Sequence, residues 1–349
     1  MKTVTEVLGE SYGLKIYSVV KQKNVYKVFS AEGCYCFKLI RYKYSHFKFI
    51  IAAMEHLSKR GFMELVPIIP TIKGESFVLY GEGYGYLSPW LKARECNYDN
   101  PYDLKEASKL LARLHNCSEG FMVKDNITPR IGWFSWIRTF ETRKSEILDF
   151  KKRISQKAKK SEFDYLYLEM MNTELNIADS SIDNLKKAGY REIMAKDIFK
   201  GGFCHHDFAH HNILITDGGK FKVIDFDYCI LDSYLHDLSS LLLRVMKNGR
   251  WEIEKSEFIL NSYRGEKDIR QEQIPVMASF MEFPQDYWQL GIQYYWEQQS
   301  YGEELFISRL KKIKEDIEDK KDFIETFRVY KLYGGREWGK GSPMTLIDI

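Results

Sequence analysis

The sequence predicts an α+β protein with two lobes, a small antiparallel-sheet lobe at the N-terminus and a larger, mostly helical lobe at the C-terminus. Its 349 residues exceed what one small core needs. Short β-branched and aromatic runs between turn residues dominate residues 1–86, and apolar residues recur at helical spacing over most of 93–349. We therefore expect lobes at 1–86 and 93–349, joined by a hinge at 87–92.

The first lobe is predicted to contain two helices and several short strands. A helical stripe over residues 47–59 ends before Gly61, which is typical of a helix C-terminus. A turn at residues 31–33 would place Lys38 opposite Val25, beside the loop at 21–24. A short helix is expected before residue 15, residues 84–90 have the pattern of a connector, and strands are expected at 15–20, 25–29, 35–40, 66–71 and 77–80.

The second lobe is predicted to be helical on both sides of one hairpin. Asp103 precedes Glu106 by three residues, as in a capping box, so a helix is expected to begin there and to reach His115, a packing or capping residue. Further helices are expected within 135–199 and at 233–247, 251–264, 274–283, 287–299 and 303–328.

The hairpin, within residues 203–227, carries a cluster of polar residues. The segment Asp217-Gly218-Gly219 separates two β-branched runs, which indicates a tight turn. A turn centred between the two glycines would place Asn212 directly opposite Asp225, with both side chains on one face of the sheet. Asp207 lies in the loop that enters the hairpin.

These residue types in this order favour phosphoryl transfer. A carboxylate such as Asp207 can orient a hydroxyl group and accept its proton. The amide of Asn212 and the carboxylate of Asp225 can hold Mg²⁺ against a nucleotide triphosphate, and Lys38 can contact the phosphates. His205 is expected to support the loop that carries Asp207.

A rival interpretation of the same segment is a zinc hydrolase. His206 and His210 are spaced i and i+4, which lets a helix present both rings to Zn²⁺. That site requires a helix through 206–210, and the strand-like residues that follow leave little room for one. We therefore expect His206, His210 and His211 to pack or to form hydrogen bonds.

Composition limits the partners and the cellular compartment that we expect for the protein. The net charge is +3, which does not suggest a nucleic-acid partner. The six cysteines form no CxxC pair, a usage that fits a reducing compartment. No apolar run has the length of a signal peptide or a membrane span. We expect a protein that is cytoplasmic on synthesis and has no membrane partner.

The hairpin motifs and several other segments resemble those of a known family. The segment Cys204-His205-His206-Asp207, followed after four residues by Asn212, and Ile224-Asp225-Phe226-Asp227 resemble the catalytic and metal-binding motifs of the aminoglycoside phosphotransferase and choline kinase superfamily. Segments at 24–28, 37–40, 111–115 and 282–288 are similar to the spore-coat branch of that superfamily, the CotS-type proteins.

The resemblance implies a protein-kinase-like fold with ATP bound between the lobes. It implies that Asp207 is the catalytic aspartate, that Asn212 and Asp225 are Mg²⁺ ligands, and that Lys38 is the phosphate lysine. It further implies Glu55 as the ion-pair partner of Lys38, residues 86–90 as the hinge near adenine, and Lys23 and Asn24 in the nucleotide loop.

Two departures from the superfamily pattern bear on whether the protein catalyses the reaction. His206 occupies a position that is commonly glycine, and the loop at 21–24 contains no glycine. The leading hypothesis is an ATP- and Mg²⁺-dependent phosphotransferase that acts on a hydroxyl of an unknown small molecule. The alternatives are a non-catalytic spore-coat component, which would have other coat proteins as partners and would be deposited in the coat, and the zinc hydrolase.

Overall fold

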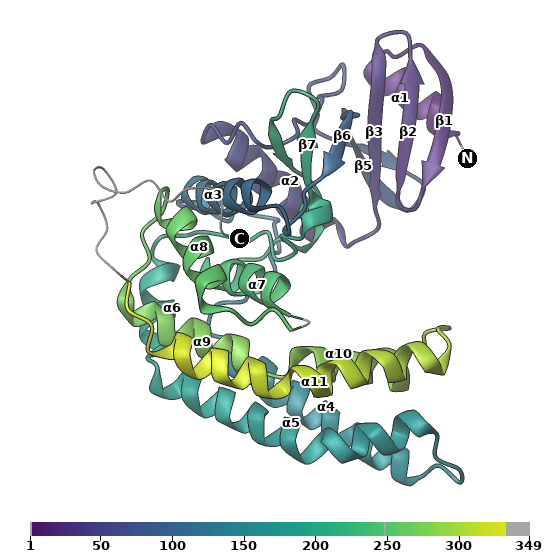
Figure 1. Cartoon of the computed structure of the whole chain (residues 1–349). Helices are drawn as coiled ribbons and strands as arrows, with labels where there is room; N and C mark the ends of the chain where they lie inside the picture. The colour runs from purple at the N-terminus through teal and green to yellow at the C-terminus, as the bar shows by residue number, and fades with distance from the viewer. Residues whose placement is uncertain (1, 248, 333–349) are drawn as a thin grey trace.

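The computed structural model describes residues 2–247 and 249–332, and they form two lobes (Figure 1). The N-terminal lobe begins with helix α1 (Val4–Tyr12), whose N-terminus is capped by Thr3. Its five-stranded antiparallel sheet has the order β1-β2-β3-β5-β4. The strands are β1 (Ile16–Gln22), β2 (Val25–Ser30), β3 (Gly33–Ile40), β4 (Val78–Tyr80) and β5 (Gly83–Pro89). Helix α2 (Tyr44–Lys59) connects β3 to the second half of this lobe.

Two N-terminal predictions are wrong. Residues 84–90, expected as a connector, belong to β5, which pairs with β3 near the centre of the sheet. The Gly-Tyr-Gly-Tyr sequence has little strand propensity of its own, so the pairing decides its structure. Residues 66–71, expected as a strand, make only an isolated bridge through Ile69, since Pro67 and Pro70 lack the backbone N–H that a strand ladder needs.

The C-terminal lobe is helical around a second, three-stranded sheet of order β6-β7-β8. Strand β6 (Ala93–Glu95) pairs with β7 (Ile213–Thr216), which pairs with β8 (Phe221–Val223). The helices are α3 (Pro101–Ser118), α4 (Trp136–Ser155), α5 (Glu162–Lys187), α6 (Tyr190–Ile198), α7 (Leu235–Met246), α8 (Ile253–Arg264), α9 (Ile274–Glu282), α10 (Gln285–Gly291) and α11 (Glu303–Arg328). The two-lobed α+β prediction is confirmed.

Helix α3 begins earlier than predicted. Its N-cap is Asn100, whose side chain accepts hydrogen bonds from the next turn, and Pro101 occupies the first helical position. Asp103, the predicted cap, is buried and pairs with Arg94 of β6 at 2.6 Å. The asparagine and the proline together, and not the capping-box pattern, set the start of the helix.

One hydrophobic core joins the two lobes. Phe47 and Phe49 of α2 belong to the same buried cluster as Leu110 of α3 and Phe203 in the loop before the hairpin. The chain leaves the first sheet after Pro89, within the predicted 87–92 hinge, and enters the second at Ala93. The shared core therefore holds the hairpin against the first sheet.

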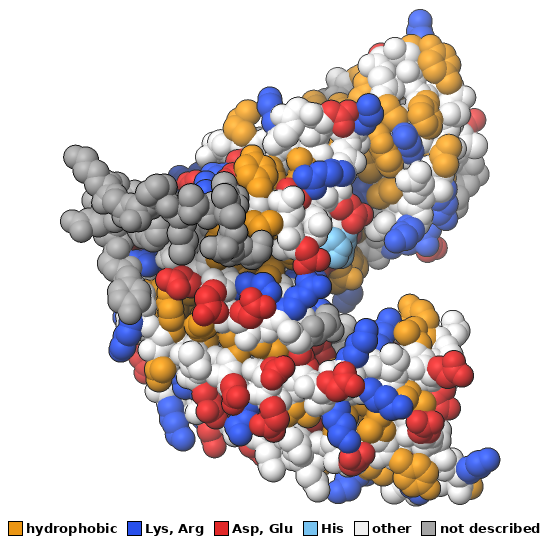
Figure 2. Space-filling view, in the orientation of Figure 1, with side chains coloured by type: hydrophobic (Ala, Val, Ile, Leu, Met, Phe, Trp, Pro, Cys, Tyr) orange, Lys and Arg blue, Asp and Glu red, His pale blue; other side chains and the backbone are white. Residues whose placement is uncertain are grey.

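Helices α4, α5, α10 and α11 form an arm that extends past the rest of the C-terminal lobe (Figure 1). A second buried cluster, rich in aromatic rings such as Phe150, Phe163 and Tyr167, stabilises this arm. In the space-filling view an open notch separates the arm from the first sheet (Figure 2). None of the helices in 2–247 and 249–332 combines the length and apolar character required to cross a membrane. The end of the predicted second lobe, 333–349, lies outside the described residues.

Candidate active site

The hairpin forms where predicted, but its register differs by one residue. Ile213 pairs with Val223 and Ile215 with Phe221. Thr216 and Lys220 close a three-residue loop in which Gly219 has φ +72°, rather than the two-residue turn expected. Asn212 consequently lies opposite Ile224, whose N–H donates to its carbonyl at 3.0 Å, so the predicted pairing of Asn212 with Asp225 is wrong.

Asp207 and Asn212 are nevertheless in direct contact at the start of the hairpin. The Nδ2 group of Asn212 donates to the backbone carbonyl of Asp207 at 2.9 Å and to its Oδ2 atom at 3.0 Å. Asn212 is buried, whereas 27% of the Asp207 side chain is exposed. Since both bonds use Nδ2, the Oδ1 atom of Asn212 is available as a cation ligand.

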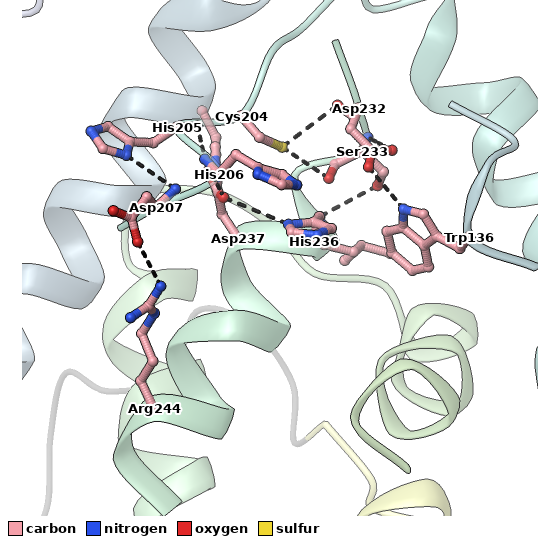
Figure 3. A network of polar contacts seen from close by, with 12 residues as sticks. Trp136, Cys204, His205, His206, Asp207, Asp232, Ser233, His236, Asp237 and Arg244 are labelled. Atoms are coloured by element: carbon pink, nitrogen blue, oxygen red, sulfur yellow. Dashed lines mark hydrogen bonds and ion pairs between the residues drawn. The ribbon is translucent and has the colours of Figure 1, made fainter. Parts of the chain in front are cut away.

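The loop that carries Asp207 is held by His205 from one side (Figure 3). The His205 ring is fully buried; its Nε2 donates to the Ile224 carbonyl at 2.9 Å, and its Nδ1 accepts from the Asp207 backbone N–H at 3.3 Å. The ring therefore links the loop to the strand that leads to Asp225. This is the supporting position that the sequence predicts for His205.

Asp237 of α7 holds the same loop from the other side. Its two carboxylate oxygens accept the backbone N–H groups of His205 at 2.7 Å and His206 at 2.8 Å. The carboxylate is buried, and burial alone would raise its pKa, but the hydrogen bond with His115 and the nearby ring of His236, 3.8 Å away, hold the pKa well below its usual value. A charged Asp237 therefore fixes the backbone immediately before Asp207.

Lys38 brings the first sheet to the hairpin. Its Nζ atom lies 2.7 Å from Oδ1 of Asp225 and 2.7 Å from Oδ1 of Asp227, and the lysine is 5% exposed. Its place opposite Val25 in the sheet is as predicted. Burial alone lowers the pKa of Lys38, but Tyr86 and the two carboxylates outweigh this effect and raise it. The lysine is therefore charged.

The pKa values of the two carboxylates next to Lys38 are shifted in opposite directions. Burial raises the pKa of both, but Lys38 outweighs burial at Asp225, whose pKa is lowered, whereas the pKa of Asp227 remains raised. Asp225 also has φ +66°, a left-handed conformation that is costly for a residue with a side chain. The backbone is thus bent at the position where the carboxylate joins the site.

The predicted ion pair between Glu55 and Lys38 is absent from the structure. Glu55 lies on α2 and accepts a hydrogen bond from the Ser76 hydroxyl, beside a separate cavity that includes Lys48 and Lys59. The apolar stripe of α2 faces the core and leaves Glu55 near the loop before β4. Asp225 and Asp227 take the place predicted for Glu55.

The helix required by the zinc interpretation does not form, so that interpretation is wrong. His206 has φ +68°, and the chain is helical only at His210–Asn212. The His206 ring stacks on the ring of His236 (Figure 3), with 4.3 Å between the ring centres. His210, in contrast, is exposed beside Tyr98. The two predicted ligands therefore have different surroundings.

The loop at 21–24 forms a tight two-residue turn. Gln22 pairs with Val25, and Lys23 has φ +53°. The turn lines a cavity of about 350 Å³ that also includes Arg41 and Asp227. Lys23 and Asn24 thus line the same cavity as Asp227, and their role in a nucleotide loop stays a prediction.

A larger cavity of about 600 Å³ opens on the other side of Asp207. It is lined by residues of α4, α5, α7, α9, α10 and α11. At its edge the Nη2 atom of Arg244 lies 2.7 Å from Oδ1 of Asp207 (Figure 3). Asp207 therefore contacts Asn212 of the hairpin and also lines this cavity.

Three features of the site were not predicted from the sequence: Arg244, Asp237 and the contact of Asp227 with Lys38. Asp237 and Arg244 are two helical turns apart, so α7 presents them on one face, but nothing in the sequence indicates that this face meets the loop before Asn212. Asp227 follows Asp225 within one motif, and this proximity was the available signal.

Comparisons with known proteins agree with this geometry. A family model described as "Spore coat putative kinase YutH" matches residues 5–327. The chain belongs to this family. The match covers the lysine of the first lobe, the hairpin and most of the helical lobe, so the predicted kinase-like superfamily and its spore-coat branch are confirmed. The narrower CotS-type assignment stays a prediction.

Solved structures share the fold of this YutH-family chain. An aminoglycoside phosphotransferase from Alicyclobacillus acidocaldarius subsp. acidocaldarius DSM 446 has a TM-score of 0.79 at 18% identity, over 94% of this chain and 96% of that one. The spectinomycin phosphotransferase APH(9)-Ia in complex with ADP and spectinomycin has a TM-score of 0.65 at 15% identity, over 94% and 98%. The amicoumacin kinase hAmiN has a TM-score of 0.63 at 15% identity, over 91% and 92%.

Proposed function

We propose that this protein is a phosphotransferase that moves the γ-phosphoryl group of ATP to a hydroxyl of a small molecule. One observation carries the proposal: a lysine of the first lobe contacts one of three polar side chains at the hairpin of the second lobe, and the other two contact each other. Lys38 contacts Asp225, and Asn212 contacts Asp207. Phosphoryl transfer needs a phosphate-binding cation, two metal ligands and a carboxylate at the acceptor hydroxyl.

The donor atoms fit a magnesium ion. Asn212 Oδ1 and the second carboxylate oxygen of Asp225 are hard oxygen ligands, which Mg²⁺ prefers. A bound Mg²⁺ would neutralise charge on the triphosphate. Asp227, whose Oδ1 lies 2.7 Å from the same Lys38 ammonium, is a further candidate ligand. The solved complexes with ADP and with AMP-PNP and Ca²⁺ belong to fold relatives and support nucleotide use here.

The two cavities suit the two substrates. In the proposed reaction the acceptor oxygen attacks the γ-phosphorus, the bond to the β–γ bridging oxygen breaks, and ADP leaves. The hydroxyl proton passes to the Asp207 carboxylate, which returns it to water. Lys38, Lys23 and Asn24 would hold the nucleotide from the side of the 350 Å³ cavity, and the acceptor would occupy the 600 Å³ cavity.

Replacement of Asp207 is the direct test. We expect Asp207→Asn to lower the rate of acceptor-dependent ADP release about 10²- to 10⁴-fold, the usual contribution of a general base. Asp217→Asn is the matched control, because Asp217 is exposed at the hairpin tip and pairs with Lys92. Equal rates for Asp207→Asn and the wild type would refute the proposed role.

A second candidate function is a non-catalytic coat component that keeps the kinase fold for assembly. The ion pair between Asp207 and Arg244 favours it, because it occupies the carboxylate that catalysis needs. The membership in a spore-coat family is consistent with deposition in the coat. Thermal denaturation with MgATP distinguishes the two: no rise in Tm at millimolar MgATP supports the assembly role, and a rise that Lys38→Met removes supports the phosphotransferase.

A further inference from the structure

The 600 Å³ cavity beside Asp207 has an uneven distribution of charge. Its wall carries both acidic and basic side chains, but the two kinds differ in their partners. The acid Glu282 pairs with Arg328, whereas the bases Arg143 and Lys247 form no ion pair with a described residue. The chemistry of the acceptor follows from this difference.

Arg143 of α4 is the clearest example. Its Nη1 atom donates to the Gln285 side-chain oxygen at 2.6 Å, and its guanidinium lies 4.4 Å from the centre of the Trp288 ring. No carboxylate of the described residues lies within ion-pair distance of it. Burial lowers its pKa to about 10, although Glu146 acts in the opposite direction. Arg143 is therefore a charged group in the cavity wall without a counter-ion, which is unfavourable until an anion binds.

Arg244 has a counter-ion, but it is the catalytic one. Its partner is Asp207, which the proposed reaction needs as a proton acceptor. Lys247, on the same side of α7, is exposed at the cavity and forms no ion pair with another described residue. Once an acceptor hydroxyl occupies Asp207, these two cations also lack a structural counter-ion.

The acids of the cavity are compensated differently. Glu282 pairs with Arg328 at 2.7 Å and accepts from Asn184. Glu174 is buried, and burial raises its pKa to about 7, partly offset by Lys320. Asp286 and Glu174 both act on the buried ammonium of Lys320, whose pKa burial lowers. Lys321 lies 3.8 Å from Glu318 and therefore has a counter-ion of its own.

We infer that the acceptor is a hydroxyl compound that carries a carboxylate or phosphate group, bound by Arg143 and Arg244 with its hydroxyl directed to Asp207. This inference rests on the proposed phosphotransferase function. An anion beside Arg244 competes with Asp207 for the guanidinium and releases the catalytic carboxylate. The same contact then selects the substrate and activates the site, whereas a cationic acceptor would be repelled by both arginines.

A matched set of sugars tests the inference with the full-length protein. Glucose, glucosamine, glucuronate and glucose 6-phosphate share one ring and differ in charge. With MgATP, we expect ADP release to rise with glucuronate or glucose 6-phosphate about 10-fold or more above its rise with glucosamine, as expected for one charge-assisted contact. Without nucleotide, the same anions should raise the Tm, and glucosamine should not.

Arg143→Gln links the effect to the cavity. We expect it to raise the KM of the anionic acceptor about 10-fold or more and to leave kcat within about threefold, because Arg143 binds the acceptor away from the reacting atoms. Arg143→Lys should recover part of the affinity. Arg138→Gln is the control, since Arg138 is exposed on the same helix.

The outcomes separate the two proposals. Preference for glucosamine or glucose, or an unchanged KM in Arg143→Gln, overturns the anionic acceptor and leaves the phosphotransferase standing. If no sugar is phosphorylated, a Tm rise with an anion that Arg143→Gln removes still supports the inference, and no rise with either anion overturns it. Absence of both MgATP binding and Asp207-dependent turnover refutes the proposed function itself.

Discussion

The Nζ atom of Lys38 lies 2.7 Å from the Oδ1 atom of Asp225, although the two residues are 187 positions apart. The same ammonium contacts Asp227, and all three groups are largely buried between the lobes. The lysine thus connects the first sheet to the hairpin. The predictions below test this connection and the network around Asp207.

Lys38→Met should destabilise the protein by about 3 kcal/mol, because it leaves two carboxylates without their buried cation. The pKa of Asp225 is lowered by Lys38, so this stabilisation is present above the ordinary value of 3.8 and is lost as the pH falls. Without Lys38, burial raises the pKa of both carboxylates, so the variant can neutralise them by protonation as the pH falls, and its difference from the wild type should be smaller at about pH 4 than at about pH 8.

Urea denaturation at the two pH values measures this effect. The double variant Lys38→Met/Asp227→Asn should recover part of the loss, since it removes one of the uncompensated charges. Lys92→Met, at an exposed lysine, is the control. A single variant as stable as the wild type would show that the pair does not contribute to stability.

Asp237→Asn should lower the free energy of unfolding by about 2–4 kcal/mol, because its carboxylate accepts two backbone N–H groups and an amide can accept only one of them without a donor–donor clash. The pKa of Asp237 lies well below 3.8, so its contribution is present at neutral pH and is lost in acid. Asp183→Asn, at an exposed residue of α5, should change stability little. Equal unfolding midpoints for the two variants would contradict the anchoring role.

Glu174→Gln should flatten the dependence of stability on pH. Burial raises the pKa of Glu174 from 4.5 to about 7, so the folded protein retains a proton that the unfolded chain releases as the pH rises between these values. Wild-type stability should therefore fall over that range, on the order of 3 kcal/mol in all from this group. Chemical denaturation at intervals from pH 4.5 to 7.5 measures the slope. Identical slopes in the variant and the wild type would exclude Glu174 as the cause.

His206→Gly should be more stable than His206→Ala by about 1–2 kcal/mol, since the backbone at 206 is left-handed and alanine keeps the Cβ that this conformation disfavours. Both variants lose the stack on His236, so their difference isolates the backbone. Thermal unfolding of the pair provides the comparison. A more stable alanine variant would show that the loop relaxes to negative φ.

Much of the fold could be predicted from local patterns. The long helices of the second lobe and the place of Lys38 opposite Val25 follow from apolar spacing and one tight turn. The prediction failed for β5, a strand of glycines and tyrosines. A side-chain Cβ at Gly85 would lie 2.2 Å from the Phe37 ring, so packing against β3 requires glycine there. Propensity cannot indicate a strand whose residues are chosen for close approach.

The candidate residues were predicted more accurately than their contacts. Asp207, Asn212 and Asp225 lie at the hairpin, as their spacing suggests, but a three-residue loop in place of a two-residue turn shifts the register by one. The partner of Lys38 could not be predicted, because α2 and the hairpin both supply acids and only packing decides which acid comes within reach.

The sequence alone determined the two-lobed class, the hairpin, and the set Lys38, Asp207, Asn212 and Asp225, because each depends on residue type and on short-range spacing. Only the tertiary structure decided that Asp225 and Asp227 pair with Lys38, that Arg244 pairs with Asp207, and that Arg143 lines the 600 Å³ cavity without a carboxylate partner. These contacts join segments far apart in the chain. They depend on the shared core that sets α2, α3 and the hairpin against one another, and no local pattern encodes that arrangement.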